Sequence, residues 1–400
     1  MSNRVTAALR KGLHVVAAAF TFAVYAIVVA PLARVLAWRR RRRGDPPRVL
    51  WGPIPLLTTA YLARASRLHG YASDSLVFHV YGNNARDEFD IALDRFDRIP
   101  FVGRLVPYAT FLWAGLRYDG FGFFFDGGLL WASPFWSAEL PLLKFAGKKV
   151  IVLPYGSDAR LPSKTRAMDR WNAYTDVAEG AEDRRQEDVQ AHLDAFGRWA
   201  DVVLGNNDLV EDLPRLDGVM PYPIDLEDWA PVPEEDDGVV TVVHSSNHRH
   251  YKGTRFVIDA VEQLRGEGLP VELDIVEGVP LAEARARYAT ADVVAGDFLL
   301  GGYANFGVEA MALGKPLLSY LRPRTARFHP EWAQSPVVSA APDEIADVLR
   351  QLVVDAERRR ELGRRGPEFV REVHSLEAVG KTLDELYRRL WGPRSAGRVP

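Results

Sequence analysis

Two patterns of hydrophobic positions divide the chain: one long apolar run near its start, and many short runs after residue 48. The long run, Leu13 to Ala33, has 21 residues, contains no charge and lies between Lys11 and Arg34. As a helix it would be about 31 Å long, which is about the thickness of the hydrocarbon core of a bilayer. The run therefore predicts a membrane helix, and Pro31 lies near its end, where a lost backbone hydrogen bond matters least.

The short runs begin after a break at residues 44–47 and alternate with amphipathic stretches. Such alternation indicates parallel β-α-β units. In the first part of the chain, strands are expected at 48–55, 75–81, 149–154 and 200–204. In the second part, strands are expected at 239–244, 271–276, 292–295 and 316–320, with helices at 254–265, 281–289 and 304–313.

These patterns predict an α/β protein with two open sheets that face a cleft, preceded by the membrane helix. The acidic, proline-bounded stretch at 232–238 is interpreted as the linker between the two sheets. Ligands of such sheets bind beyond the carboxyl ends of the strands, so the loops that follow strands are the places to search. The expected boundaries are 1–45 for the apolar and polybasic segment, 46–232 and 238–375 for the two domains, and 376–391 for a final helix.

The composition and the absence of known motifs exclude several classes of reaction and of binding site. The chain has 400 residues and no cysteine, which excludes disulfides, a thiol nucleophile, iron–sulfur ligation and a cysteine-based zinc site. No P-loop, no G-x-G-x-x-G after a strand, no H-E-x-x-H and no strand-terminal Asp-x-Asp occur. Basic residues of the body are interspersed with acids, so nucleic acid is not an expected partner.

The net charge of −3 hides an uneven distribution. Residues 1–43 hold nine basic residues and no acid, which leaves 41 basic and 53 acidic residues, a net of −12, in the rest. Three basic residues precede the apolar run and six follow it. The positive-inside rule then places the body in the cytoplasm.

Three readings of the apolar run remain open: a simple span, a helix that lies in the membrane interface, and a cleaved signal peptide. Five consecutive arginines directly after the run oppose export. Either of the first two readings holds the body at the cytoplasmic face of the cell membrane.

The strongest local signal is the segment VVHSSNHRHYKGT at 242–254, where a strand ends in a polar loop and a helix begins. Free backbone N–H groups and the helix dipole then point toward any group above the strand. Arg249 and Lys252 add two positive charges, a combination suited to a departing diphosphate. The alternatives are a metal site built on His244, His248 and His250, or a surface turn with incidental charge.

Two further segments carry candidate site residues. In 297–320, Gly301 and Gly302 would let the backbone approach a ligand, and Glu309 could accept hydrogen bonds from a ribose diol or merely complement a helix N-terminus. In LPYGSDAR, at 153–160, Gly156 permits a tight turn after a strand. Asp158 and Arg160 would face the cleft there, although a capping role for Ser157 or Asp158 is an equal alternative.

Six segments, taken together, resemble the retaining family 4 glycosyltransferases (glycosyl transferases group 1), and the resemblance covers roughly residues 48–391. The segments are GSDAR at 156–160, NNDLVEDLP at 206–214, PYPIDLEDW at 221–229, HSSNHRHYKGT at 244–254, YATADVV at 288–294 and GGYANFGVEAMALGKPLL at 301–318. The resemblance implies a GT-B fold, with two Rossmann-like domains and a final helix that crosses back to the first. It implies contacts from Arg249 and Lys252 to the donor diphosphate and from Glu309 to the ribose. It assigns Arg249, Lys252 and Asp158 to catalysis, Glu309, Gly301, Gly302, Tyr303, Asn247 and Glu277 to the donor, and Gly156, Ser157 and Arg160 to the acceptor side.

The sequence departs from that family at two positions. Many members carry a glutamate eight positions before the second one, and Gly301 stands there. The histidine that many members use in the first-domain loop is also missing, and Asp158 occupies that region.

The resemblance implies transfer with retention from a nucleotide-sugar, in which the departing phosphate takes the proton, with neither metal nor cofactor. Together with the apolar run, it predicts a membrane-associated glycosyltransferase that acts on a lipid-linked or polysaccharide acceptor. A non-catalytic, glycosyltransferase-like partner subunit and a two-domain epimerase are the alternatives. The aromatic section at 121–136 would either hold the acceptor or form buried core.

Overall fold

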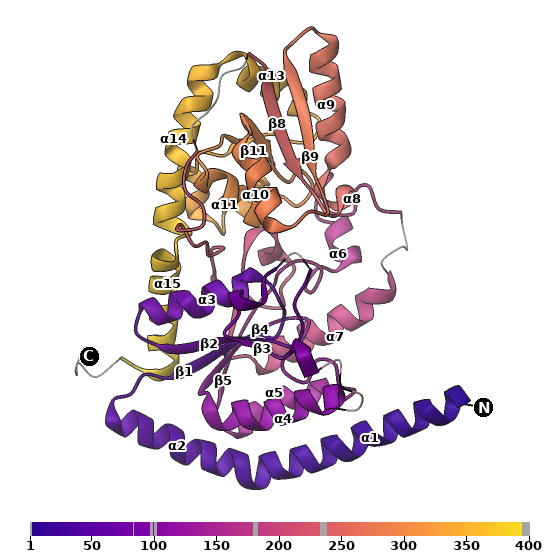
Figure 1. The fold of residues 1–400 in the computed structure, drawn as a ribbon, viewed down its shortest axis with the longest axis vertical. Coiled ribbons are helices and arrows are strands. Elements are labelled where there is room, and N and C mark those ends of the chain that lie inside the picture. Colours follow the sequence, from indigo (N-terminus) through magenta and orange to yellow (C-terminus); the bar gives the residue numbers. More distant parts are fainter. Residues whose placement is uncertain are drawn as a thin grey trace.

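The computed structural model describes residues 2–82, 84–96, 99, 102–178, 183–232 and 238–393, without the side chains of residues 2–11, 13, 183 and 184. The chain forms two domains stacked along the long axis of the molecule, each built on a parallel sheet with helices on both faces (Figure 1). The α/β prediction with two facing sheets is confirmed.

The first sheet has seven parallel strands in the order β3-β2-β1-β4-β5-β6-β7. Side chains of its central strands alternate between two cores, as the two-residue period of a strand requires. Leu50 and Phe121 face one core, and Val49 and Ile151 face the other. The strands are β1 (Arg48–Trp51), β2 (Ala72–Val77), β3 (Ile91–Ala92), β4 (Gly120–Phe124), β5 (Lys149–Leu153), β6 (Val202–Gly205) and β7 (Gly218–Val219).

Strand β4 decides between the two interpretations of the aromatic section. Phe121, Phe123 and Phe124 are fully buried in the centre of the sheet, so this part of the section forms core and not an acceptor surface. The helices of this domain are α3 (Leu57–Leu68), α4 (Val102–Arg117), α5 (Glu139–Phe145), α6 (Pro162–Arg166) and α7 (Asp183–Trp199).

The second sheet has five parallel strands in the order β12-β11-β10-β8-β9. They are β8 (Val240–Ser245), β9 (Val271–Val276), β10 (Val293–Ala295), β11 (Leu317–Ser319) and β12 (Val338–Ser339). The order reverses direction beside β8 and β10, which makes their carboxyl ends the place where a ligand binds in such sheets. The helices are α8 (Arg249–Lys252), α9 (Thr254–Gly266), α10 (Leu281–Ala289), α11 (Ala304–Ala312), α12 (Pro323–Ala326), α13 (Ile345–Val354) and α14 (Ala356–Val373).

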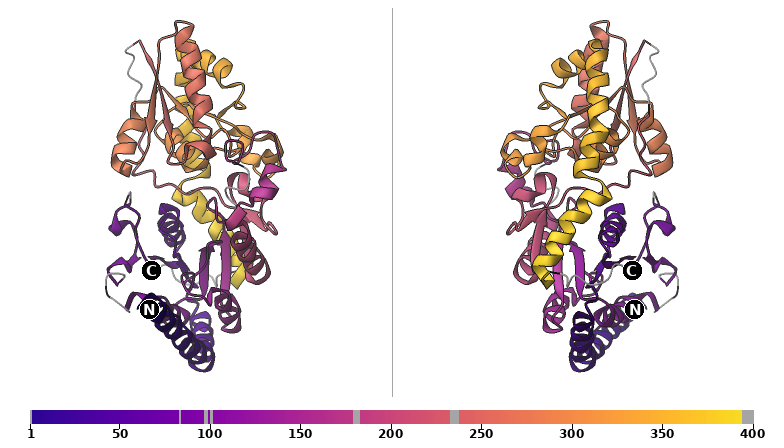
Figure 2. Two further views of the ribbon diagram at one scale, coloured as in Figure 1. Left: turned by 90° about the vertical axis from the view of Figure 1, so that its right-hand side faces the viewer. Right: turned by 90° about the vertical axis from the view of Figure 1, so that its left-hand side faces the viewer.

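The chain crosses between the domains twice, and the two crossings touch. Ile224 N, on the outward crossing, donates a hydrogen bond of 2.9 Å to His374 O on the return crossing. The return crossing continues as α15 (Leu376–Trp391), which runs down the first domain (Figure 2). There Tyr387 is buried and its hydroxyl lies 2.9 Å from Ser66 Oγ.

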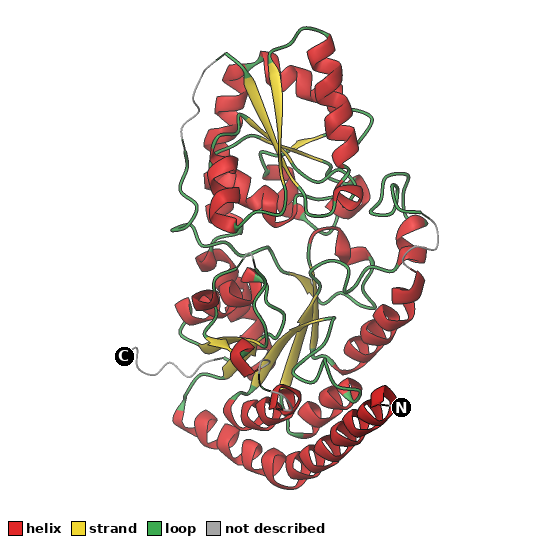
Figure 3. Cartoon of the chain, turned by 45° about the vertical axis from the view of Figure 1, so that its right-hand side comes forward, coloured by secondary structure: helices red, strands yellow, loops and turns green. Residues whose placement is uncertain are grey.

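The N-terminal segment forms one long bent helix that lies along the end of the first domain (Figures 1 and 3). It consists of α1 (Ser2–Val24), a π-helical stretch (Tyr25–Val29) and α2 (Ala30–Arg43). The part from His14 to Arg43 is long and apolar enough to cross a membrane by length and composition. Nothing in the hydrophobic pattern predicts that this helix packs on the body, whereas in the structure it docks against α4 and α5.

Small residues, Val29 and the ring of Tyr25 form the fully buried part of the docked side of this helix. Tyr25 is fully buried and stacks on Phe111 of α4, with ring centroids 4.4 Å apart. Gly115 makes room for this ring, because a Cβ there would lie 2.6 Å from Tyr25 Cε2. The docked side, called the inner face below, consists of Ala18, Thr21, Tyr25, Val29 and Ala33, all buried.

Candidate active site

A cavity of about 570 Å³ lies between the two domains, at the carboxyl ends of strands from both sheets. Its first-domain wall is the loop after β5, including Gly156, Ser157 and Arg160. Its second-domain wall is the loop after β8 and includes Lys252. Its volume lies within the range of small-molecule sites. The remaining lining residues are Tyr155, Pro162, Tyr174, Arg185, Val189, His248, His250, Tyr251 and Leu300.

The loop after β8 is held by a buried histidine. His244 Nδ1 lies 2.8 Å from Ala295 O, and its Nε2 lies 2.9 Å from Thr254 Oγ1. Burial lowers the pKa of His244 to about 4, so the ring is neutral at pH 7. Because both ring nitrogens have hydrogen-bond partners, His244 stabilises the loop and is not available as a ligand of the metal site considered above.

Lys252 is the cation of this loop that lines the cavity. Its Nζ lies 3.1 Å from Asp297 Oδ1, and Asp297, which follows β10, is only 1% exposed. Burial raises the pKa of Asp297, and Lys252 opposes that shift. Gly253, in the left-handed region at φ 78°, turns the chain from α8 into α9. The first turn of α9 therefore begins at Thr254, two residues after Lys252.

Arg249, the second predicted cation, is placed differently. Its guanidinium donates two hydrogen bonds, of 3.0 and 2.8 Å, to Glu277 Oε2 after β9, and it does not line the cavity. Asn247 Oδ1 accepts a hydrogen bond of 3.1 Å from Gly278 N. The predicted donor residues Asn247 and Glu277 thus tie the loop after β8 to the loop after β9.

Asp158 does not face the cleft, contrary to the prediction. Its carboxylate is buried and accepts hydrogen bonds from the backbone N–H groups of Phe125 (3.1 Å), Tyr155 (2.9 Å) and Gly156 (2.8 Å). Burial, with Asp126 adding to it, raises the pKa of Asp158 to about 7, and the three N–H donors oppose that shift. The residue holds the loop in shape from beneath, as the alternative capping role requires.

Arg160 lines the base of the cavity but is already paired. Its guanidinium lies 2.6 Å from Asp208 Oδ2, and both side chains are buried. Ser157, by contrast, is exposed, and a Cβ at Gly156 would meet no atom within 4 Å. Gly156 and Ser157 therefore form the open part of the first-domain wall.

The two glycines after β10 pack against protein in this structure. Gly301 has φ 82°, and a Cβ there would lie 2.7 Å from Arg322 Cζ. A Cβ at Gly302 would overlap the side-chain amide of Asn207 in the first domain. A glutamate at position 301 would therefore be strained. The left-handed backbone explains why glycine stands at this position in place of the family glutamate.

Tyr303 also differs from its predicted place. Its side chain is buried in the second-domain core, and its hydroxyl lies 2.9 Å from His374 Nε2. The ring packs beside Trp332 and Phe369, so it points away from the cleft.

Glu309, on α11, lines a second interdomain hollow of about 190 Å³. Tyr61 and Asn84 form part of its first-domain wall. Burial raises the pKa of Glu309 to about 7, and Lys252 and Arg285 oppose the shift. Lys252 Nζ also lies 6.0 Å from the ring centroid of Phe306 on α11. The two predicted donor residues Lys252 and Glu309 thus occupy neighbouring hollows of one cleft.

Several residues of the site were not predicted. Asp297 directly follows a buried strand, which is the signal that could have marked it. Tyr251 packs edge-to-face against Tyr174 across the cavity, with centroids 5.8 Å apart, and Arg185 comes from α7. His248 and His250 were considered only as metal ligands, whereas the structure places them in the cavity wall.

No protein-family model matches the chain, and no curated protein matches its sequence. Solved structures do match it. Sucrose-phosphate synthase from Thermosynechococcus elongatus is 15% identical with a TM-score of 0.59, over 87% of this chain and 99% of the other. HepE from Anabaena, solved in complex with UDP-glucose, is 12% identical with a TM-score of 0.55, over 86% and 100% of the two chains. WaaG, a glycosyltransferase involved in lipopolysaccharide biosynthesis, is 12% identical with a TM-score of 0.53, over the same shares.

The chain has the GT-B fold. The likeness spans the full length of these solved chains, so both domains and the cleft between them belong to the GT-B architecture. In this GT-B protein the cavity and the hollow at Glu309 both lie between the domains, where loops from the two sheets meet.

Proposed function

We propose that this GT-B protein is a nucleotide-sugar-dependent glycosyltransferase. One observation carries the proposal: Lys252 and the loop of Gly156 and Ser157 form opposite walls of a single interdomain cavity. A transferase needs a cation at the departing phosphate and an open wall for the second substrate, and this cavity offers both. UDP-glucose bound to HepE, a protein of the same fold, supports a nucleotide-sugar donor.

The donor lies, in this proposal, across the cavity and the hollow at Glu309. Lys252 and the N-terminal N–H groups of α9 meet the charge of the diphosphate as the sugar leaves. Glu309 accepts hydrogen bonds from the ribose hydroxyls. Arg249 reaches the phosphates only after it releases Glu277, so it contributes to closure around the donor. Charge compensation rests on these side chains, and no metal or cofactor takes part.

The acceptor approaches past Gly156 and Ser157, and Arg160 shapes the base of the cavity through its pair with Asp208. Transfer with retention follows if the acceptor hydroxyl attacks from the side on which the diphosphate leaves. The departing phosphate then takes the hydroxyl proton. This assignment suits a cavity in which Asp158 is buried beneath the loop and cannot act as a base.

The acceptor we propose is lipid-linked or an envelope glycan, at the cytoplasmic face of the cell membrane. The apolar N-terminal helix with its arginine run supports this location. WaaG, which shares the fold, acts in lipopolysaccharide biosynthesis.

The test is a screen of nucleotide-sugars by thermal shift, followed by release of nucleoside diphosphate in the presence of a membrane extract. A donor at 100 times its Kd stabilises the folded state by about 2.7 kcal/mol, which is a measurable shift. If no common donor stabilised the protein or released diphosphate, the proposal would fail.

A non-catalytic partner subunit is the second candidate, favoured by Gly301 in place of the family glutamate. It predicts nucleotide binding by calorimetry without turnover, and turnover only after a partner enzyme is added.

A further inference from the structure

The side of the N-terminal helix that faces away from the body is apolar and exposed. Its residues recur at helical spacing and are defined here as the outer face: Val16, Phe20, Ile27, Val35 and Trp38, which are 45–74% exposed. In Figure 3 the helix lies along the first domain, and no other element of the described part of the chain covers this side. A helix with apolar residues on two opposite sides, one docked on protein and one exposed, is suited to lie between a protein and an apolar phase.

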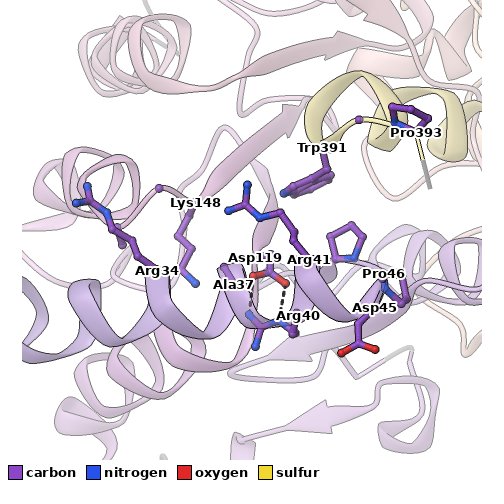
Figure 4. Close-up of a pocket in the computed structure, with 15 residues that line it drawn as sticks. Arg34, Ala37, Arg40, Arg41, Asp45, Pro46, Asp119, Lys148, Trp391 and Pro393 are labelled. Carbon is purple, nitrogen blue, oxygen red and sulfur yellow. Dashed lines mark hydrogen bonds and ion pairs between the residues drawn. The ribbon is translucent and has the colours of Figure 1, made fainter. Parts of the chain in front are cut away.

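A cavity of about 310 Å³ opens beside the end of this helix (Figure 4). Its walls come from α2, from the turns before β4 and β5, and from Trp391 at the end of α15. It lies at the amino ends of the strands, on the opposite side of the first domain from the cleft. It is therefore separate from the proposed active site.

Cations dominate this cavity, and it is called the basic cavity below. Arg34, Arg40, Arg41 and Lys148 line it, with two acids, Asp45 and Asp119. Arg40 and Asp119 neutralise each other through hydrogen bonds of 2.5 and 3.1 Å. Asp45 is exposed and points away from the interior (Figure 4).

Three cations therefore remain for a ligand. Lys148 is 2% exposed, and its ammonium donates to Tyr118 O, which leaves further N–H groups. Burial lowers the pKa of Lys148 to about 8; Asp119 opposes this, while Arg40 and Arg41 add to it. The side chain of Arg41 has no hydrogen bond or ion pair with the described residues, and its guanidinium extends toward Trp391 (Figure 4). Arg34 donates to Phe145 O.

We propose that the N-terminal helix lies in the plane of the membrane surface, with its outer face in the bilayer, and that the basic cavity binds the phosphate of an anionic lipid headgroup. The two features are adjacent: the outer face ends at Trp38, and the cavity begins at Arg34 and Arg41 on the same helix. Guanidinium and ammonium groups are the side chains that bind phosphate most strongly. The volume of the cavity suits a headgroup and is at the lower limit for a larger ligand.

The inner face argues against a helix that crosses the bilayer. A spanning helix would leave the first domain and expose Tyr25, Phe111 and the small residues packed around them. The in-plane position retains this packing and still gives the outer face an apolar surrounding. The inference rests on the membrane association proposed above, and it does not depend on glycosyl transfer.

The test is flotation of the full chain with vesicles of phosphatidylcholine, with and without phosphatidylglycerol. Arg34→Gln with Arg41→Gln removes two cations of the cavity. Arg39→Gln with Arg43→Gln removes two cations of the same arginine run that do not line it. Each basic residue near an anionic bilayer contributes about fivefold to partitioning, so the control pair should lose about 25-fold. The cavity pair should lose about tenfold more, because it also loses charge-assisted hydrogen bonds.

Equal losses for the two pairs would mean diffuse attraction and would overturn the cavity assignment. The same would follow if vesicles charged with oleate, a carboxylate, preserved the difference between the pairs. Stabilisation of the chain by millimolar inorganic phosphate alone, as strong as that by anionic vesicles, would assign the cavity to a soluble phosphate. Unchanged thermal unfolding of both pairs controls for misfolding.

The cysteine-free sequence offers a direct test of the in-plane position. A single Ser2→Cys variant expressed in intact cells should react with a membrane-impermeant maleimide only after lysis. Reaction from outside would show a spanning helix and overturn the inference. Nucleoside diphosphate release in detergent, measured on the same variants, reports on the proposed function separately.

Discussion

Replacement of Lys252 tests the proposed chemistry most directly, and the structure shows why a single substitution is not enough. Lys252→Met removes the cation at the departing diphosphate. By analogy with the loss of one preorganised donor at a developing charge, kcat should fall by about 10²- to 10³-fold, or about 2.7–4 kcal/mol. Methionine keeps most of the side-chain volume, so packing beside Phe306 should survive.

The same substitution also leaves Asp297 without its charged partner. At 3.1 Å and an effective dielectric constant of about 20, the Coulomb attraction of this pair is about 5 kcal/mol before desolvation is counted. Because Asp297 is buried, its carboxylate must either remain unpaired or take a proton, and breaking such a pair costs about 3–5 kcal/mol. Lys252→Met alone should therefore lower both activity and stability.

The double variant Lys252→Met/Asp297→Asn separates the two effects. It removes both charges, so most of the stability should return while kcat remains low. The assay is release of nucleoside diphosphate with the donor found by screening, paired with thermal unfolding of wild type, both single variants and the double variant. A double variant with turnover within about threefold of wild type would refute the role of Lys252, since the lost donor is expected to cost at least about 10²-fold.

Three further predictions follow from the site and the N-terminal helix. Donor affinity should rise with pH through about 7, because ribose hydroxyls favour the ionised form of Glu309, whose pKa is raised to about 7. Calorimetry at pH 6 and pH 8 should show this rise. The variant Glu309→Gln has no carboxyl group to titrate at this position, so its donor affinity should not change between the two pH values. Gly301→Glu introduces the glutamate of the family pattern but should destabilise the fold by about 1–3 kcal/mol, because the backbone of residue 301 is in the left-handed region and a side chain there would meet Arg322. A variant as stable as wild type in urea titrations would show that the loop can rearrange. Tyr25→Ala should lower the free energy of unfolding by about 3–5 kcal/mol, because a buried ring is lost. Phe20→Ala on the outer face should change it by less than about 0.5 kcal/mol in detergent. Equal effects of the two variants in denaturant titrations would mean that the helix does not dock as described.

Strand β4, one of four strands that were not predicted (with β3, β7 and β12), differs from the predicted strands for a physical reason. The segments around Val150 and Val243 are unbroken β-branched runs, and such runs identify buried parallel strands without further information. Strand β4 carries glycines at positions 120 and 122, which weaken the local signal. Gly122 is there because a Cβ would overlap the ring of Trp51 on the neighbouring strand, a contact that local sequence does not reveal.

The candidate site likewise has features that could be predicted from the sequence and features that could not. The loops could be located because they follow strands, and Lys252 was found for that reason. The roles of Asp158 and Tyr303 depended on partners far along the chain, namely Phe125 N and the ring of His374. The docking of the N-terminal helix likewise depends on Phe111, which no periodicity within the helix could indicate.

In the proposed membrane-bound state, the position of the N-terminal helix sets a distance between the bilayer and the proposed reaction. The helix and the basic cavity lie at one end of the first domain, and the cleft opens at the other end (Figure 1). A chain anchored through this helix therefore holds its cleft one domain's height above the lipid surface. A headgroup with a single sugar could not reach that height, whereas a partly built glycan could. The proposed function and the proposed membrane position together therefore favour elongation of a growing chain over its first attachment to the lipid.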